Sequence, residues 1–583
     1  MANSRIIIVG GGLAGLMAAI KSAELGMAVD LFSIVPVKRS HSVCAQGGIN
    51  AAKNTKGEGD STFKHFDDTI YGGDFLANQP PVKAMCDAAP GIIDLLDRMG
   101  VMFNRTPEGL LDFRRFGGTL YNRTAFAGAT TGQQLLYALD EQVRRFEADG
   151  KVTKYEGWEF LSAVLDGNRR CHGICAMDLR SMQLKTFAAD AVIIATGGNG
   201  SIFGKSTNSV VCTGSAQSAL YQQGAVYANG EFIQVHPTAI PGEDKLRLMS
   251  ESARGEGGRV WTVRDGKPWY FLEEWYPKYG NLVPRDIATR AIHKVVYELG
   301  LGLDGKAAVY LDVSHIPVET LNRKLGGILE IYEKFVGVDP RKHPMKVFPG
   351  MHYTMGGLWI DYDQMTNLPG LFAAGEAEYQ YHGANRLGAN SLVSCIYGGM
   401  VAGRTAAAYS KNNAKSAEAV SSTVFEQELK RQQELNDALL KGQGGENPFH
   451  IWKEMGELMT EHCTVVRNNK GLRKADEQLV TLLERSRRMN LSDRSSWANQ
   501  TLAFCRELTN MLQLARVIAR GAEARNESRG AHYKPDFPDR DDANWMKTTK
   551  AVFAPDADEP VLSYEAVDAS LIQPRPRKYD IAA

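Results

Sequence analysis

The sequence has no excess of charge of either sign and no long apolar run, and both absences limit its partners. Lys plus Arg and Asp plus Glu number 67 each among 583 residues, so no net field attracts the chain to nucleic acid or anionic lipid. No uninterrupted apolar segment approaches the roughly 20 residues that cross a bilayer. The first β-branched run ends at glycines rather than at a cleavage site, so no secretory signal is expected. If the protein acts at a membrane, another subunit must anchor it.

Cysteine is scarce and scattered. Of the eight cysteines, only Cys171 and Cys175 lie close in the sequence, and no second pair accompanies them. The spacing of the cysteines therefore predicts neither a zinc site nor an iron–sulfur cluster, and no metal ligands are predicted. Reduced thiols in a cytoplasmic protein are the favoured interpretation.

The segment 5–33 predicts a dinucleotide-binding unit. A strand at 5–9 is followed by Gly10-Gly11-Gly12-Leu13-Ala14-Gly15, a helix at 16–25 capped by Gly26, and a second strand at 28–32. The glycines fit G-x-G-x-x-G: they permit the turn and the close approach of a pyrophosphate, whose charge the helix N-terminus stabilises. Ser33 stands where an acidic residue would hold the ribose of NAD, and this favours FAD.

Two later blocks also favour FAD. Residues 190–198 predict a buried strand that ends in Ala195-Thr196-Gly197-Gly198, and residues 370–376 predict a short apolar strand that delivers Gly375-Glu376. Flavoproteins with two dinucleotide folds carry these three elements in this order, with the Gly-Glu pair near the ribityl chain. The long separation between the second block and the third means that another domain must be inserted there. No second G-x-G-x-x-G is present, and a separate NAD site is not expected.

The polar motifs of the insertion and its edges suit a small anionic substrate. Histidines and arginines occur there in glycine-rich backbone rather than in amphipathic helices. Arg386 is suited to bidentate binding of one carboxylate, and imidazoles are suited to another. A structural ion pair is the alternative for each residue taken singly. For His41 taken alone, the alternative is a surface histidine in a glycine-rich loop.

The predicted fold class is α/β, with a Rossmann-like FAD-binding domain, an inserted α+β capping domain, a helical domain and an extended C-terminal region. The FAD-binding domain is predicted over 1–234 and 350–411, the capping domain over 235–349, the helical domain over 412–525 and the C-terminal domain over 526–583. Apolar residues at helical spacing, including Leu502, Leu508 and Met511, predict core packing in a helical bundle. The polar, proline-bearing tail is expected to wrap a surface rather than form a core.

These motifs closely resemble the flavoprotein subunit of succinate dehydrogenases and fumarate reductases over nearly the whole chain. The resemblance rests on residues 39–42 (Arg-Ser-His-Ser), 114–118, 236–238 (His-Pro-Thr), 254–258, 284–286 (Pro-Arg-Asp), 352–357, 383–388, 527–532 and 541–545. Residues 271–274 and 361–367 look most like the branch that has a single dihaem cytochrome b anchor and commonly uses menaquinone.

The resemblance implies a role for each motif residue. His41 would form a covalent 8α bond to FAD. Succinate or fumarate would be bound at one carboxylate by His352 and Arg386 and at the other by His236 and Ser250, with Phe116 also in contact. Most relatives have threonine where Ser250 stands, and the hydroxyl donor is retained. Arg285 would donate and accept the proton, with Glu251 and Arg254 relaying protons to solvent. The other residues expected to contact FAD are Gly10, Gly12, Leu13, Ala14, Gly15, Ser33, Lys38, Ser40, Ser42, Gln46, Gly47, Gly48, Ala195, Thr196, Gly197, Glu376, Arg386, Ser391 and Leu392.

The expected partners follow from what the chain does not contain. Electrons that leave a flavin need a conductor, and the sequence has neither cluster ligands nor a haem motif. We therefore expect an iron–sulfur subunit and, beyond it, a membrane cytochrome b that reacts with a quinone. The chain would then lie peripherally on the cytoplasmic side of the cell membrane, and no nucleic acid is expected as a partner.

Two alternative functions share part of the pattern. A soluble L-aspartate oxidase has motifs like Ala45-Gln46-Gly47-Gly48 and His-Pro-Thr, but that family usually lacks a histidine at the position of His41. A tRNA-modifying flavoprotein has a similar FAD fold, but the balanced charge and the absence of a basic stripe disfavour it.

Overall fold

A five-stranded parallel sheet organises the N-terminal half of the chain, whose computed structural model describes residues 4–242, 245–557 and 559–579. The strand order is β19-β10-β1-β2-β6, so the N-terminal strand is central. The strands are β1 (Arg5–Val9), β2 (Ala28–Ser33), β6 (Val152–Glu156), β10 (Ala191–Ile194) and β19 (Leu371–Ala373). The four strands expected from the sequence are confirmed, and β1, β10 and β19 are the ones that deliver the three predicted FAD blocks.

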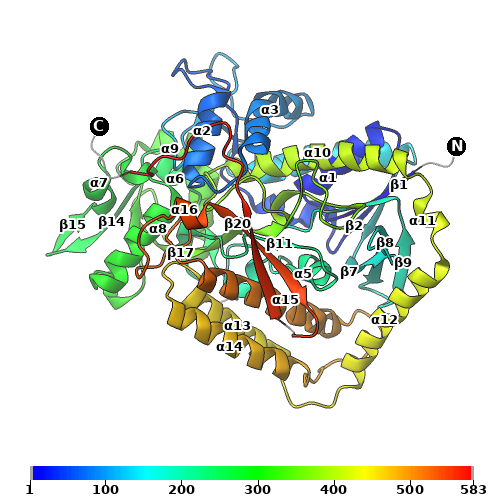
Figure 1. Cartoon of the computed structure of the whole chain (residues 1–583). Helices are drawn as coiled ribbons and strands as arrows, with labels where there is room; N and C mark the ends of the chain where they lie inside the picture. Colours follow the sequence, from blue (N-terminus) through cyan, green and yellow to red (C-terminus); the bar gives the residue numbers. More distant parts are fainter. Residues whose placement is uncertain (1–3, 243–244, 558, 580–583) are drawn as a thin grey trace.

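Helices cover one face of this sheet, and a small antiparallel sheet covers the other. Helix α1 (Leu13–Glu24) connects β1 to β2 and packs against α4 (Thr131–Ala148) and α10 (Asn390–Asn412) (Figure 1). Gly399 and Gly403 let α10 approach closely, because a Cβ at either position would overlap the backbone of α1. On the opposite face, apolar residues of β1 and β10 share a core with β7 (Trp158–Leu165) and β8 (Cys171–Asp178), which continue into β9 (Leu184–Ala188).

The insertion folds around a six-stranded antiparallel sheet. Its order is β13-β12-β17-β16-β14-β15, and its strands are β12 (Ile233–Ile240), β13 (Arg247–Leu248), β14 (Arg259–Arg264), β15 (Lys267–Trp269), β16 (Val309–Asp312) and β17 (Met345–Thr354). Helices α8 (Arg285–His293) and α9 (Val318–Val336) share its core. Strands β12 and β17 pair with each other, so the chain enters and leaves the insertion side by side.

Shorter elements connect these units. They are η1 (Val37–Arg39), η2 (His41–Cys44), β3 (Ile49–Asn50), α2 (Thr62–Gly72), α3 (Gln79–Arg98), β4 (Phe113–Arg114), β5 (Thr124–Ala125), α5 (Ser215–Gln222), α6 (Ser252–Gly255) and α7 (Phe271–Trp275).

A group of helices follows the FAD-binding region, as expected. Its members are α12 (Ser422–Lys441), α13 (Pro448–Cys463), α14 (Asn469–Ser486) and α15 (Gln500–Ala524), and α13 and α14 lie along the lower side of the molecule in Figure 1. The predicted apolar stripe of α15 is buried, including Leu502, Leu508 and Met511. The stripe therefore serves core packing.

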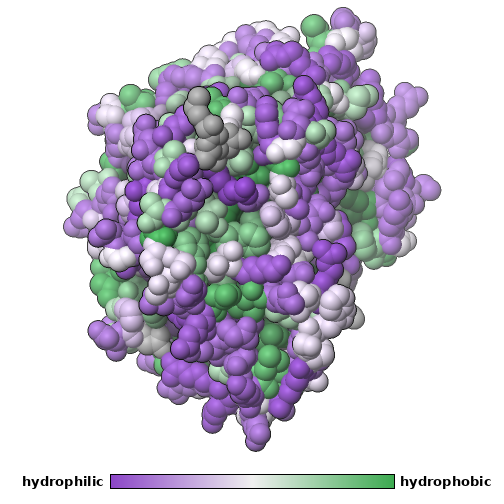
Figure 2. Space-filling view, turned by 90° about the vertical axis from the view of Figure 1, so that its right-hand side faces the viewer, coloured by the Kyte–Doolittle hydropathy of each residue, from purple (hydrophilic) through white to green (hydrophobic). Residues whose placement is uncertain are grey.

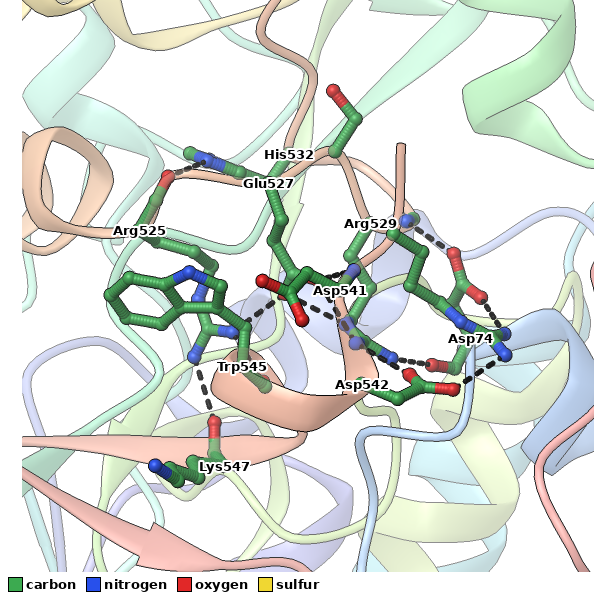
Figure 3. Close-up of polar contacts among 12 residues, drawn as sticks. Asp74, Arg525, Glu527, Arg529, His532, Asp541, Asp542, Trp545 and Lys547 are labelled. Atoms are coloured by element: carbon green, nitrogen blue, oxygen red, sulfur yellow. Dashed lines mark hydrogen bonds and ion pairs between the residues drawn. The ribbon is translucent and has the colours of Figure 1, made fainter. Parts of the chain in front are cut away.

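The C-terminal segment differs from the expectation that it would only wrap a surface. Strands β20 (Lys547–Ala554) and β21 (Glu559–Ala566) form a hairpin that joins β11 (Tyr227–Ala228) and β18 (Gly357–Leu358) in one sheet. Just before it, charged side chains are fully buried in a network of ion pairs (Figure 3). Arg525 bonds to Glu231 and Glu527 at 2.8 Å each, and Arg529 also bonds to Glu527 at 2.8 Å. The polar composition predicted exposure, but mutual pairing allows these charges to be buried.

The surface agrees with the balanced composition. Figure 2 shows hydrophilic residues over most of one face, interrupted by hydrophobic residues across its middle. Within residues 4–242, 245–557 and 559–579, no helix combines the length and the apolar character that a membrane crossing requires.

Candidate active site

One cavity of about 490 Å³ extends from the glycine loop after β1 to the strands of the insertion. It brings together motifs that are widely separated in the sequence, from Gly10 to Ser391. All of the predicted site residues except Gly15, Lys38 and Arg254 line it: Gly10, Gly12, Leu13, Ala14, Ser33, Ser40, His41, Ser42, Gln46, Gly47, Gly48, Phe116, Ala195, Thr196, Gly197, His236, Ser250, Glu251, Arg285, His352, Glu376, Arg386, Ser391 and Leu392.

The three exceptions have other surroundings. A Cβ on Gly15 would overlap the carbonyl oxygen of Gly10, so Gly15 permits the tight strand–helix turn without facing the cavity. The ammonium of Lys38 lies 3.6 Å from Asp140 and 3.8 Å from Glu141 on α4. Arg254 lies behind Glu251, as described below.

The three predicted FAD blocks meet at one end of the strands. Gly10 has φ +119°, and a Cβ there would overlap the backbone of Ala195 in the second block. In the third block, Glu376 accepts a hydrogen bond of 3.0 Å from the Thr354 N–H. Burial raises the pKa of Glu376 to about 7. The N-terminus of α1 faces the same space, where its free N–H groups suit a phosphate.

His41 is held by a loop that the sequence motifs did not single out. The Ser209 N–H donates to His41 Nδ1 at 3.1 Å. The Asn208 amide nitrogen lies 3.1 Å from His41 Nε2 and donates to the carbonyl of His352 at 2.9 Å. Burial and the charge of Lys245 lower the pKa of His41 to about 4. His41 is therefore a neutral imidazole with a fixed ring orientation at neutral pH.

Arg386 supplies a buried positive charge to the cavity. It is 2% exposed and lies 4.4 Å from the centre of the Tyr353 ring. It forms no ion pair with any carboxylate among the residues that the structure describes, and its buried Nε has no hydrogen-bond partner. Burial, followed by the charge of Arg285, lowers its pKa to about 9, so it remains charged at neutral pH. A buried guanidinium that faces a cavity and has no carboxylate partner is suited to binding an anion.

Two histidines lie beside this cation on neighbouring strands. The ring centres of His236 and His352 are 5.0 Å apart, and the β12–β17 pairing shifts register around His236. The Thr238 N–H donates to His236 Nδ1 at 3.2 Å, which places the ring proton on Nε2. That Nε2 is buried without a partner, so it offers a free donor in the cavity.

The electrostatics of the cavity keep both imidazoles neutral. Burial and the charge of Arg285 lower the pKa of His236 and of His352 well below the ordinary value. The Thr207 hydroxyl lies 2.6 Å from His352 Nδ1 and fixes that ring. Ser250 completes this side of the cavity: it is buried, and its hydroxyl lies 2.6 Å from that of Ser252.

A chain of charged groups leads from the cavity into the insertion. Arg285 donates to Glu251 Oε2 through Nε at 2.9 Å and pairs with it through Nη2 at 2.8 Å. Arg254 donates to the other oxygen, Oε1, at 2.6 Å. Burial raises the pKa of Glu251, but the charges of Arg285 and Arg254 outweigh burial and hold it below its usual value. The predicted proton-transfer residues are thus in direct contact.

Glycines leave room for this carboxylate. A Cβ at Gly117 would overlap Glu251 Oε1, and a Cβ at Gly388 would lie 2.6 Å from Oε2. Phe116 is beside them and closes over Gly47, where a Cβ would meet its ring at 2.6 Å. Glycines from two motifs that are distant in the sequence therefore leave space for one side chain, that of Glu251.

Comparison with known proteins identifies the family. Residues 5–392 match the family described as FAD binding domain, and residues 452–579 match the family described as Fumarate reductase flavoprotein C-term. The succinate dehydrogenase flavoprotein subunit of Bacillus subtilis (strain 168) is 67% identical over 579 residues, which cover 99% of both chains. The fumarate reductase flavoprotein subunit of Escherichia coli (strain K12) is 35% identical, over 98% of this chain and 95% of that protein.

This chain belongs to the succinate dehydrogenase/fumarate reductase flavoprotein subunit family.

The structure of a variant of the E. coli quinol fumarate reductase FrdA has the same fold as this family member. It superposes with a TM-score of 0.93 at 33% identity, and the match covers 100% of this chain and 99% of that one. The predicted fold class is confirmed, and the protein is the FAD-dependent catalytic subunit of an oxidoreductase. The L-aspartate oxidase and tRNA-modifying alternatives are not favoured.

Several residues of the flavoprotein site were missed from the sequence. Thr207, Asn208 and Ser209 hold the two key histidines, and Gln234 accepts from Arg285 Nη1 at 2.9 Å. The only signal for the first three was an uninterrupted run of small polar residues at 206–209. Gln234 adjoins the His-Pro-Thr motif, but a buried amide gives no signal of its own.

Proposed function

We propose that the chain interconverts succinate and fumarate in the cavity that joins the FAD blocks to Arg386, with FAD attached covalently to His41. One observation carries the proposal: the buried, unpaired guanidinium of Arg386 and the unpaired Nε2 of His236 face the same cavity as the Arg285–Glu251 pair. A dicarboxylate supplies two anions for these donors and places its central carbons between them.

FAD, when bound, supplies the hydride acceptor or donor. The protein's contribution begins with orientation, because holding both carboxylates fixes the two central carbons relative to the ring and to Arg285. Arg386, His352, His236 and Ser250 form the carboxylate-binding surface. Their positive and donor character also stabilises the negative charge that develops as hydride and proton are exchanged.

Arg285 is the proposed proton donor and acceptor. As the acid in fumarate reduction it carries the proton to be donated, since a guanidinium is a charged donor at neutral pH. Glu251 contacts it directly and is ionised, so Glu251 can take up a proton and return it to Arg285 after each turnover. Arg254 on the other oxygen of Glu251 extends this path away from the cavity. The same groups serve oxidation in reverse, and the direction is set by the potentials of flavin, cluster and quinone.

The environment of His41 supports the covalent 8α-histidyl bond. A histidine must be neutral to act as a nucleophile, and the pKa of His41 is lowered to about 4. The Ser209 N–H donates to Nδ1, so the neutral ring carries its proton on Nε2, and that proton must leave as Nε2 bonds to the flavin methyl carbon. None of the proposed substrate contacts uses His41. Its role is to raise the flavin potential until succinate can reduce it.

The proposed partners follow the family. The relatives include a quinol-fumarate reductase solved with menaquinol molecules, which is 34% identical with a TM-score of 0.89. By analogy, we assign this chain an iron–sulfur subunit, a membrane cytochrome b of the single dihaem type reached through that subunit, and menaquinone as the quinone. It would sit peripherally on the cytoplasmic side of the membrane. The proposed domain limits are 1–234 with 350–411, 235–349, 412–525 and 526–583.

The test combines flavin retention with activity in His41→Ser. Acid precipitation should leave fluorescent flavin on the parent and release it from the variant. With an artificial acceptor, the parent should oxidise succinate and not L-aspartate. His41→Ser should bind FAD, retain some fumarate reduction and lose succinate oxidation. Undiminished succinate oxidation in His41→Ser would remove the proposed role of the bond, and parent activity on L-aspartate alone would remove the substrate assignment.

A further inference from the structure

Two carboxyl groups at the far end of the cavity have no role in the chemistry above. Glu159, near the start of β7, is 4% exposed and lines the cavity, and neither of its oxygens has a hydrogen-bond partner. Glu507, on α15, lines the same cavity. A buried carboxyl group with two unpaired oxygens is costly unless a ligand satisfies it. This pair therefore marks a subsite whose occupant supplies hydrogen-bonding groups.

The strand order places this subsite beyond the ribose of a bound dinucleotide. The pyrophosphate belongs at the glycine loop after β1, and the adenosine ribose at the end of β2, where Ser33 stands. Strand β6 is next in the sheet, with Glu156 paired to Ser33 and the Gly157 N–H donating to the Ser33 carbonyl at 2.8 Å. Glu159 follows closely in the sequence, so it lies where the adenine base would lie.

The neighbouring acidic residue, Glu156, already has a hydrogen-bond partner. Glu156 Oε1 accepts from the Val37 N–H at 2.8 Å, and Glu156 does not line the cavity. Of Glu156 and Glu159, only Glu159 therefore lines the cavity. On the opposite wall, α5 packs against both β7 and α15, which brings Glu507 from the helical region to the same subsite.

Burial favours the protonated form of both carboxyl groups. Burial, followed by the charge of Glu159, raises the pKa of Glu507 well above its ordinary value, and burial raises the pKa of Glu159 to about 7 against the charge of Arg506. Arg506 on α15 acts on Glu159, and Glu428 and Arg431 on α12 and Cys175 on β8 interact in turn with Arg506. Arg506 donates to Asn436 and Gln432, and Glu428 is bonded to Arg431 at 2.7 Å. None of these groups forms a hydrogen bond with Glu159.

We propose that the carboxyl group of Glu159 recognises the adenine base of FAD. A protonated carboxyl group presents one O–H donor beside one carbonyl acceptor. Adenine presents the complementary pair, with N1 as acceptor and the 6-amino group as donor. Glu159 would donate to N1 and accept from the amino group. This inference rests on the FAD site of the proposed function, but it does not depend on the dicarboxylate chemistry.

The experiment uses the full-length chain carrying His41→Ser, in which FAD binding is expected to be reversible. Its dissociation constants are measured for FAD and for flavin 1-deazaadenine dinucleotide, in which a C–H replaces N1 and cannot accept a hydrogen bond. We expect the parent to prefer FAD by about 10-fold or more, because the analogue leaves the buried carboxyl donor without its acceptor. Glu159→Leu should lose this preference. Glu428→Gln, a nearby carboxyl that does not line the cavity, is the matched control and should keep it.

A second variant separates recognition from folding. Glu159→Gln retains one donor and one acceptor without a titrating proton, so its FAD affinity should not depend on pH. The parent should bind FAD more weakly as pH rises above about 7, because Glu159 then loses the proton that it donates to N1.

Each outcome decides the proposal. Equal affinity of the parent for the two dinucleotides overturns it, as does a preference that persists in Glu159→Leu. If Glu159→Leu does not fold, the pH profile of Glu159→Gln decides, and a slope equal to the parent's overturns the proposal. Normal FAD preference in the His41→Ser chain, together with no succinate oxidation by the protein that retains His41, would contradict the proposed function alone, so the two failures are distinguishable.

Discussion

Replacing Arg386 with methionine should stabilise the substrate-free protein while it abolishes tight dicarboxylate binding. The two effects have opposite signs because Arg386 is a buried cation without a carboxylate partner among the described residues. Its neighbours add to the cost: Arg285 is also positive and lowers the pKa of Arg386. A purely structural arginine would show the reverse, since its removal would leave a carboxylate unpaired.

The magnitudes follow from general values for buried charges. Exchange of buried ionic groups for well-packed apolar ones is commonly neutral or stabilising by about 1–4 kcal/mol, and we expect a gain within this range in the free energy of unfolding. Loss of one partner of a buried charge pair costs about 2–5 kcal/mol of binding. For malonate, a dicarboxylate without the central C–C bond that reacts, this corresponds to roughly 30- to 4,000-fold weaker binding.

The assay is thermal unfolding of FAD-loaded protein, with and without malonate. The parent should gain stability with malonate, whereas Arg386→Met should start at a higher midpoint and gain little. Arg123→Met is the matched control, because Arg123 is equally buried but paired with Asp60 at 2.6 Å. It should be destabilised and should still respond to malonate. Destabilisation of Arg386→Met together with a full malonate response would refute the reasoning.

Three further predictions concern other parts of the molecule. Malonate affinity should fall as pH rises from the low pKa of substrate-free His352 to the higher pKa that a bound anion gives it, because binding takes up a proton between these two values. Titrations from pH 5.5 to 8 should show this slope, and His352→Gln should reduce it. Gly117→Ala should lower kcat about 100-fold at unchanged FAD content, because the added Cβ displaces Glu251, and steady-state assays with flavin absorbance test this. Arg525→Met should lower the urea-unfolding free energy by about 3–5 kcal/mol, because Glu231 and Glu527 lose a buried partner; a change below about 1 kcal/mol would contradict the network's role.

Much of the fold could be predicted because its signals are local. The strand at 5–9, the glycine turn and the helix after it depend on neighbouring residues, and the structure has them close to the expected limits. The C-terminal hairpin could not be predicted in this way. Its pairing partner, Tyr227–Ala228, is very short and lies in a distant part of the sequence. Similarly, the tail from Asn526 was expected to wrap a surface, because composition does not reveal the ion pairs that bury Glu527 and Arg529.

The residues of the candidate site likewise divide into those with a local sequence signal and those without one. Residues within glycine-rich motifs, such as His41, His236 and Arg386, could be singled out because such backbone rarely serves only packing. Asn208 and Glu159 could not, since a single amide or carboxyl group in an ordinary segment carries no pattern. Their importance depends on burial and on unpaired atoms, which only the folded chain defines.

The distribution of the site over the fold explains why its parts must be assembled together. His41 and Arg386 belong to segments outside the insertion, whereas Arg285 and Glu251 belong to the insertion and contact each other there. The Arg285–Glu251 pair is therefore formed within the insertion, while Gly117 and Gly388 from outside it leave room for the carboxylate of Glu251. His236 and His352 lie on β12 and β17, the paired strands by which the chain enters and leaves the insertion. Asn208 then joins His41 to the backbone of His352. A displacement of these two strands would thus change the carboxylate-binding imidazoles and the anchor of His41 at once, and it would also reach Arg285 through Gln234 of β12.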